Sequence, residues 1–117
     1  MATRVLIAED SAPLRALIRE MLGEDCDVVG EAADGDEAVA LFDRERPDAV
    51  VMDVRMPGRD GIEATAAIKQ IDPDASVLVC TAAGDEEAVR ASAAGADGHV
   101  AKPFQKPQLL SALRRAG

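Results

Sequence analysis

The chain has almost no aromatic residues: Phe42 and Phe104 account for the whole aromatic content of 2%, and Trp and Tyr are absent. Two rings cannot build a platform on which bases or sugars stack. The two cysteines, Cys26 and Cys80, lie far apart in the sequence and lack the short spacing of a zinc site. Cys80 lies inside an apolar run. We therefore expect two free thiols, with neither a disulfide nor a thiolate metal site.

Long apolar runs and basic charge are also scarce. The longest uncharged apolar stretch has about nine residues, against the roughly 20 needed to cross a bilayer, and the first residues do not resemble an export signal. The 13 basic residues against 22 acidic ones give a net charge of -9, which opposes binding to nucleic-acid phosphates or anionic lipid. We expect a cytoplasmic protein with no direct nucleic-acid contact and no membrane insertion.

The remaining composition is that of a compact globular chain. Hydrophobic residues make up 48% and charged residues 30% of the 117 residues, and the chain has only 9 Gly and 6 Pro. This length is that of one domain and leaves no room for a second hydrophobic core. We expect one domain over residues 1–117.

Short apolar runs that each end in a polar residue predict the strands. Residues 5–8 precede Glu9 and Asp10, residues 49–52 precede Asp53, residues 77–80 precede Thr81, and residues 99–101 precede Lys102. A fifth, weaker run covers residues 27–31. Continuous rather than alternating apolar runs are typical of parallel strands buried on both faces of a sheet.

Helical patterns separate these strands. The first is capped by Ser11, carries Pro13 in its first turn and stops at Gly23. The others begin at or near Gly35, Gly61, Asp85 and Pro107, and the second, third and fourth end at Pro47, at Asp72-Pro73 and at Gly95. Five β-strand and α-helix units with right-handed crossovers predict an α/β protein with an open, doubly wound parallel sheet.

In such a sheet, ligands bind beyond the carboxyl ends of the strands, where the polar residues Glu9, Asp10, Asp53, Thr81 and Lys102 fall. Carboxylates that stay charged close together need a cation, and an oxygen-only ligand set suits Mg²⁺. A carboxylate nucleophile at Asp53, with Lys102 and the Thr81 hydroxyl as donors to an anion, supplies the parts of a phosphoryl-transfer site. Taken singly, these residues could also be a helix cap, a loop carboxylate, a strand end and a solvated charge. Together they favour a phosphoryl-transfer site.

These motifs, together with Met56-Pro57-Gly58, Gly61 and Lys102-Pro103-Phe104, strongly resemble the CheY-like receiver domains of bacterial two-component response regulators. The resemblance covers the whole chain. It implies a flavodoxin-like (βα)5 fold with five parallel strands in the order 2-1-3-4-5. It also implies a phosphoacceptor, rather than an enzyme with a separate substrate, that assists its own phosphorylation and dephosphorylation.

The resemblance assigns roles residue by residue. Asp53 matches the aspartate that accepts a phosphoryl group from a histidine kinase, and Thr81 and Lys102 match the residues that bind the phosphoryl oxygens. Glu9, Asp10, Asp53 and the backbone carbonyl of Arg55 match the Mg²⁺ site. The switch residues would be Thr81, His99, Lys102 and Pro103. A cis bond before Pro103 would aim the Lys102 ammonium inward. Gly58 and Gly61 would let the loop after Asp53 approach the phosphoryl group.

Two positions depart from the family pattern. Glu9 stands where Asp is commoner, so its extra methylene leaves direct metal contact open. His99 stands where many receivers have Tyr or Phe, and we expect a partly buried ring that substitutes for the aromatic rather than a pH sensor.

The motifs indicate three alternative functions. The favoured one is a monomeric stand-alone signalling domain, most similar to chemotaxis regulators, with a CheA-like histidine kinase and an output protein such as a flagellar motor switch component as partners. The second is the receiver part of a longer regulator with a DNA-binding output domain. The chain ends directly after its last helical pattern, which favours the first function if the chain is complete. The third, a Mg²⁺-dependent phosphatase with an aspartate nucleophile, conflicts with the order of motifs, because such enzymes place a DxD nucleophile motif first.

Overall fold

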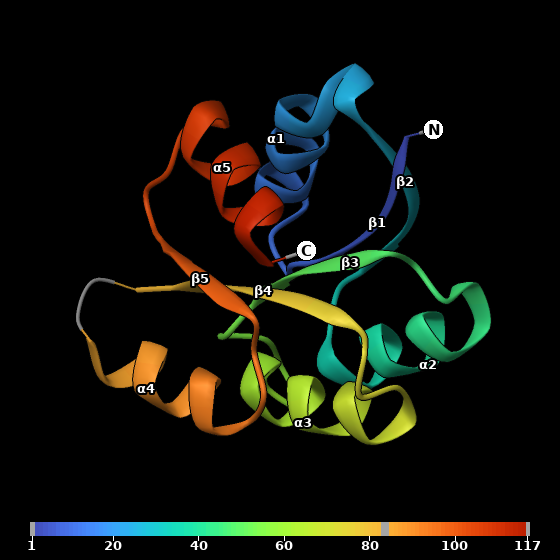
Figure 1. Ribbon diagram of the computed structural model, residues 1–117, viewed down its shortest axis with the longest axis vertical. Coiled ribbons are helices and arrows are strands. Elements are labelled where there is room, and N and C mark those ends of the chain that lie inside the picture. Colours follow the sequence, from blue (N-terminus) through green and yellow to red (C-terminus); the bar gives the residue numbers. More distant parts are fainter. Residues whose placement is uncertain (1, 83–84, 117) are drawn as a thin grey trace.

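Five parallel strands form one sheet in the computed structural model, which describes residues 2–82 and 85–116. The strands are β1 (Thr3–Ala8), β2 (Cys26–Ala32), β3 (Ala49–Asp53), β4 (Ser76–Thr81) and β5 (Gly98–Ala101). Their order across the sheet is β2-β1-β3-β4-β5 (Figure 1). This confirms both the doubly wound sheet and the strand order, and the weak apolar run at residues 27–31 lies inside the edge strand β2.

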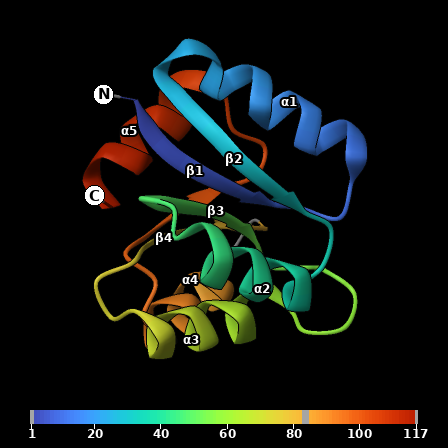
Figure 2. The same ribbon diagram turned by 90° about the vertical axis from the view of Figure 1, so that its right-hand side faces the viewer.

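Five helices cover the two faces of this sheet. They are α1 (Ala12–Leu22), α2 (Gly35–Glu45), α3 (Gly61–Ile71), α4 (Asp85–Ala93) and α5 (Lys106–Ala116), and a short 3-10 turn at Gly23–Asp25 follows α1. Helices α1 and α5 pack on one face, and α2, α3 and α4 pack on the other (Figures 1 and 2). Among the described residues no helix is long and apolar enough to span a membrane.

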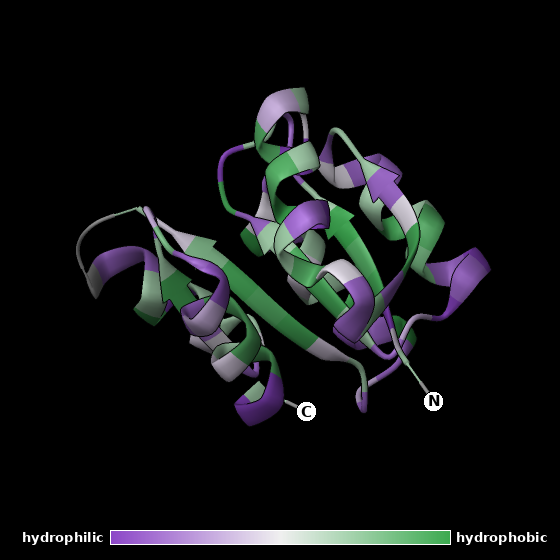
Figure 3. Ribbon diagram, turned by 90° about the horizontal axis from the view of Figure 1, so that it is seen from above, coloured by the Kyte–Doolittle hydropathy of each residue, from purple (hydrophilic) through white to green (hydrophobic). Residues whose placement is uncertain are grey.

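The alternation of side chains along the strands divides the core into two layers. In β1, Leu6 and Ala8 point into the layer under α2 and α3, whereas Val5 and Ile7 point into the layer under α1 and α5. Every residue of β3 is buried, as its central place in the sheet requires. Figure 3 shows the hydrophobic strands between helices whose outer faces are hydrophilic.

Helix boundaries follow local capping chemistry. Ser11 caps α1, as predicted, by accepting a hydrogen bond from the N–H of Leu14 at 3.3 Å, and Gly23 ends the helix. Two caps were not predicted: Asp34 accepts from the N–H of Glu37, and Asp60 forms a reciprocal capping box with Glu63. These caps fix where α2 and α3 begin, immediately after the loops at the carboxyl ends of β2 and β3.

Candidate functional site

The predicted site residues come together at one edge of the sheet, because the carboxyl ends of parallel strands meet there. Ala8 pairs with Met52, which places Glu9 beside Asp53, and Asp53 pairs with Cys80, the residue before Thr81. Thr81 in turn pairs with Ala101, the residue before Lys102. The spacing of five polar residues after four apolar runs therefore becomes one cluster in space.

Glu9 is a buried carboxylate that uses both of its oxygen atoms. Its side chain accepts a hydrogen bond from Lys102 Nζ through Oε1 at 3.0 Å and from the Ser11 N–H through Oε2 at 3.1 Å. Its residue is only 1% exposed, so these contacts replace the water that a charged carboxylate loses on burial. The guanidinium of Arg15 donates to the Glu9 carbonyl at 2.8 Å and fixes the backbone at this turn.

Lys102 is shared between two carboxylates. Its Nζ lies 2.6 Å from Asp53 Oδ1 and 3.0 Å from Glu9 Oε1. Burial lowers the pKa of Lys102, but the hydrogen bonds to Asp53 and Glu9 and the charges of both carboxylates raise it by more, so the net pKa is raised. Lys102 therefore carries a positive charge at neutral pH next to the predicted phosphoacceptor, which is 5% exposed.

Asp10 completes an acidic cluster. Glu9, Asp10 and Asp53 each offer a carboxylate oxygen, and these three atoms all lie within 4.8 Å of one another. Hydrogen bonding with Glu9, then burial and the charge of Glu9, raise the pKa of Asp10, while its own backbone and Lys102 act in the opposite direction. A hard divalent cation would relieve this repulsion, and three carboxylate oxygens fit the ligand preference of Mg²⁺. The exposed position of Asp10 leaves one side of the cluster open to solvent.

Thr81 and Pro103 occupy their expected places, but His99 does not. Thr81 is 1% exposed, and its carbonyl accepts a hydrogen bond from the Lys102 N–H at 2.8 Å. The bond between Lys102 and Pro103 is cis, as the family resemblance implied. His99, which we expected to be a partly buried ring, is exposed because the edge strand β5 alternates between half-buried and exposed residues, and His99 falls on the exposed side.

The glycines after Asp53 serve the backbone in two different ways. Gly58 has φ of +72°, a left-handed conformation that side chains rarely adopt. A Cβ on Gly61 would lie 1.8 Å from the carbonyl oxygen of Asp53, and the Gly61 N–H donates to the Val54 carbonyl at 2.8 Å. Gly61 therefore lets the start of α3 pack directly against the backbone of the predicted phosphoacceptor.

The two cysteines are free thiols and add no charged group to this cluster. Cys26 and Cys80 are both free, as predicted, and Cys80 is buried in β4. Burial, followed by the nearby charge of Asp53, raises the pKa of Cys80 to about 12, although Lys102 acts in the opposite direction. Cys80 is therefore a neutral core residue at physiological pH.

One contact of the site was not predicted from the sequence. Glu87 of α4 accepts a hydrogen bond from the Ala82 N–H at 2.7 Å and lies 3.4 Å from Arg55 Nε. From the sequence, Glu87 was only one of the acidic residues at the start of a helix. No sequence spacing pointed to this contact, because it joins three segments that meet only in the folded chain.

The fold and the site together define a class of protein: a doubly wound receiver domain with an acidic cluster and a lysine at the carboxyl edge of its sheet. The family model for the response regulator receiver domain matches residues 5–114, and the chain therefore belongs to this family. Receiver domains of two-component response regulators are phosphoacceptors that bind Mg²⁺ at an acidic pocket and work with histidine kinases and output proteins.

The relatives of the chain include both chemotaxis proteins and transcriptional regulators. The chain is 47% identical over 114 residues to the chemotaxis protein CheY of Halobacterium salinarum, covering 97% of this chain and 95% of that protein. It is equally identical, over 117 residues, to the transcriptional regulatory protein PdtaR of Mycobacterium tuberculosis, covering 97% of this chain and 56% of that protein. Among solved structures, a two-component response regulator of the LuxR family from Aurantimonas matches with a TM-score of 0.91 at 36% identity, covering 97% of this chain and 84% of that one.

Proposed function

We propose that Asp53 accepts a phosphoryl group from the phosphohistidine of a sensor kinase in a Mg²⁺-dependent step. The observation that supports this most directly is the position of Lys102 Nζ, 2.6 Å from Asp53 Oδ1 and 3.0 Å from Glu9 Oε1, beside three clustered carboxylates. The proposed domain comprises residues 1–117 and acts in the cytoplasm as a monomer.

In this step an Asp53 carboxylate oxygen attacks phosphorus and forms a new P–O bond. The P–N bond to the donor histidine breaks, and its electron pair stays on the ring nitrogen, which leaves as neutral imidazole when the other nitrogen is protonated. Lys102 and the Thr81 hydroxyl hold the phosphoryl oxygens and orient the group, so most of the catalysis is positioning and neutralisation of charge. The product is an acyl phosphate, which water can hydrolyse.

The acidic cluster would hold Mg²⁺ through Asp10, Asp53 and the carbonyl of Arg55. When bound, Mg²⁺ neutralises charge on the phosphoryl oxygens. Glu9 is already committed to Lys102 and to the Ser11 N–H, so we assign it to positioning Lys102 and to contact with the metal through water.

The magnesium requirement gives the first test. Incubation with a small acyl phosphate and Mg²⁺ is expected to add one phosphoryl group to the chain, and removal of Mg²⁺ with a chelator is expected to prevent the addition. Asp10→Asn should raise the Mg²⁺ concentration for half-maximal incorporation by at least about tenfold, because it removes a charged ligand. Intact-mass spectrometry measures both effects. A chain that gains no phosphoryl group under any of these conditions would instead be a constitutive interaction module.

The proposed output is a change on the surface formed by α4, β5 and α5. The pull of the phosphoryl group on Thr81 and Lys102 would shift an existing two-state equilibrium toward the partner-binding form. The similarity to chemotaxis proteins supports a CheA-like kinase and a flagellar motor switch component as partners. The equal identity to a transcriptional regulator and the match to a LuxR-family regulator support the second candidate, the receiver part of a longer regulator with a DNA-binding domain.

Lys102 is expected to couple phosphorylation to this surface. Lys102→Ala should still gain a phosphoryl group at saturating donor, but α4, β5 and α5 should no longer change their hydrogen-exchange protection on phosphorylation, because the ammonium that reports the new anion is missing. The matched control is Lys106→Ala, which removes an exposed lysine at the start of α5. A full exchange response in Lys102→Ala would show that the signal reaches the surface without Lys102.

A further inference from the structure

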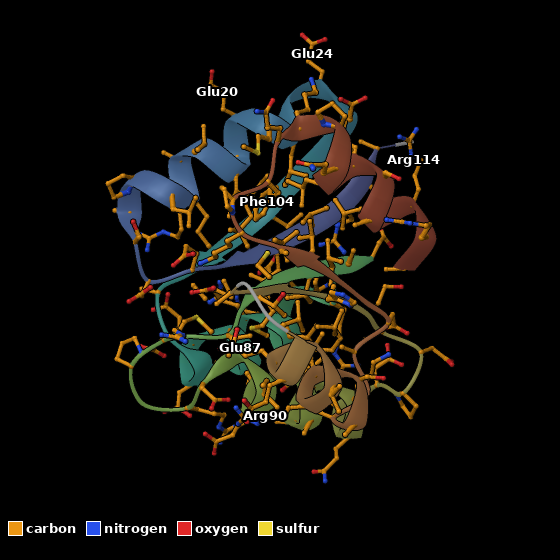
Figure 4. All side chains as sticks on the ribbon, turned by 90° about the vertical axis from the view of Figure 1, so that its left-hand side faces the viewer. Glu20, Glu24, Glu87, Arg90, Phe104 and Arg114 are labelled. Atoms are coloured by element: carbon orange, nitrogen blue, oxygen red, sulfur yellow. The ribbon has the colours of Figure 1, made fainter. Side chains whose placement is uncertain are left out.

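Glu87 connects α4 to two loops of the proposed phosphorylation site. Its Oε1 accepts the Ala82 N–H at 2.7 Å, and its Oε2 lies 3.4 Å from Arg55 Nε. The Glu87 side chain is 17% exposed, whereas that of Arg55 is 80% exposed. In Figure 4, Glu87 lies between α4 and the strands, whereas Arg90 of the same helix lies farther from the sheet.

Both partners of Glu87 occupy equivalent places relative to Asp53. Asp53 pairs with Cys80 across β3 and β4, so Arg55 and Ala82 each lie two residues beyond this pair, toward the edge where the site is built. An N–H and a guanidinium are the donors that an anion at this edge would use. In the unphosphorylated chain, the carboxylate of Glu87 holds both of them.

A phosphoryl group on Asp53 would compete for these donors. It carries more negative charge than a carboxylate and offers three acceptor oxygens. It would also repel the Glu87 carboxylate. The Glu87 carboxylate and the phosphoryl group therefore compete for the same two donors. Each of the two interactions lowers the stability of the other by the same free energy.

Resting on the proposed function, we propose that Glu87 is a latch: it holds Ala82 and Arg55 in the unphosphorylated chain and yields both donors to the phosphoryl group, which releases the start of α4. The latch gives α4 a direct link to the chemical state of Asp53, separate from the link through Lys102. It also sets the free energy that the phosphoryl group must supply before the surface of α4 changes.

The test is an equilibrium titration with beryllium fluoride and Mg²⁺, which forms an acyl phosphate analogue on a carboxylate. Amide resonances in two-dimensional NMR report both binding and the state of Ala82. Glu87→Ala is expected to bind the analogue about fivefold or more tightly than the native chain, because no latch has to open. Glu87→Gln keeps an oxygen that can accept from Ala82 but loses the charge, so its affinity should be intermediate.

Glu86→Gln is the matched control. Glu86 is the exposed neighbour of Glu87 on the same helix, and its charge is screened by salt, so its removal should leave the affinity at the native value. In the unliganded state, the Ala82 amide resonance and the exchange protection of α4 should already change in Glu87→Ala and not in Glu86→Gln.

The outcomes separate this inference from the proposed function. If the native chain binds the analogue and Glu87→Ala binds it with the same affinity as Glu86→Gln, the latch is overturned and the phosphoacceptor role stands. If the native chain does not bind the analogue or accept a phosphoryl group, the proposed function fails and the latch fails with it.

Discussion

Asp53→Asn is expected to reduce phosphoryl incorporation to the level of a sample without donor. The amide cannot act as the nucleophile, and it loses the negative charge that holds Lys102 Nζ at 2.6 Å. Intact-mass spectrometry after incubation with a small acyl phosphate and Mg²⁺ measures the loss directly. The change replaces one oxygen atom by an NH₂ group of similar size, so the fold should be retained.

The matched control is Asp27→Asn, which makes the same chemical change on the exposed side of the edge strand β2. This variant should incorporate one phosphoryl group like the native chain. Undiminished incorporation in Asp53→Asn would place the acceptor on another residue and overturn the assignment.

Gly61→Ala is expected to be the most destabilising small substitution in the site. The added Cβ would lie 1.8 Å from the Asp53 carbonyl oxygen and 2.7 Å from its carbon, and these are backbone atoms that no side-chain rotation can move. The start of α3 must therefore shift away from β3. The expected cost is about 3 kcal/mol, the upper end of the usual range for overpacking. For a chain of this size, that cost lowers the thermal midpoint by about 10 °C, measured by circular dichroism.

Gly98→Ala controls for the general effect of the substitution. A Cβ on Gly98 would lie 3.5 Å from its nearest neighbour, which is ordinary van der Waals contact, and Gly98 lies in the strand β5. Its thermal midpoint should stay near the native value. Equal midpoints for the two variants would contradict the close packing of α3 against Asp53.

The strands β1, β3 and β4 could be predicted because strands that are buried on both faces have continuous apolar sequences. The run before Asp53 is apolar throughout, and every residue of β3 is buried in the structure. β2 was the weakest prediction because it is an edge strand, and most of its residues are half-buried or exposed. The starts of α2 and α3 were predicted from Gly35 and Gly61, but the caps Asp34 and Asp60 were missed, because an aspartate before a glycine is also typical of a loop or turn.

The site could be predicted only in part. Residues that follow buried strands were placed correctly at one edge, because strand direction alone decides this. His99 was expected to be partly buried from family resemblance, whereas its place in β5 makes it exposed. Glu87 could not be predicted, because its contacts with Ala82 and Arg55 depend on how α4 packs beside two loops, and no local pattern encodes that distance.

Locating the phosphoryl group on the chain would show whether Asp53 carries it. After incubation with a small acyl phosphate and Mg²⁺, borohydride reduces an aspartyl phosphate to homoserine, and peptide mass spectrometry then identifies the altered residue. We expect homoserine at position 53 and unaltered aspartate at position 10. Homoserine at another position, or none in a chain that has gained a phosphoryl group, would contradict this expectation.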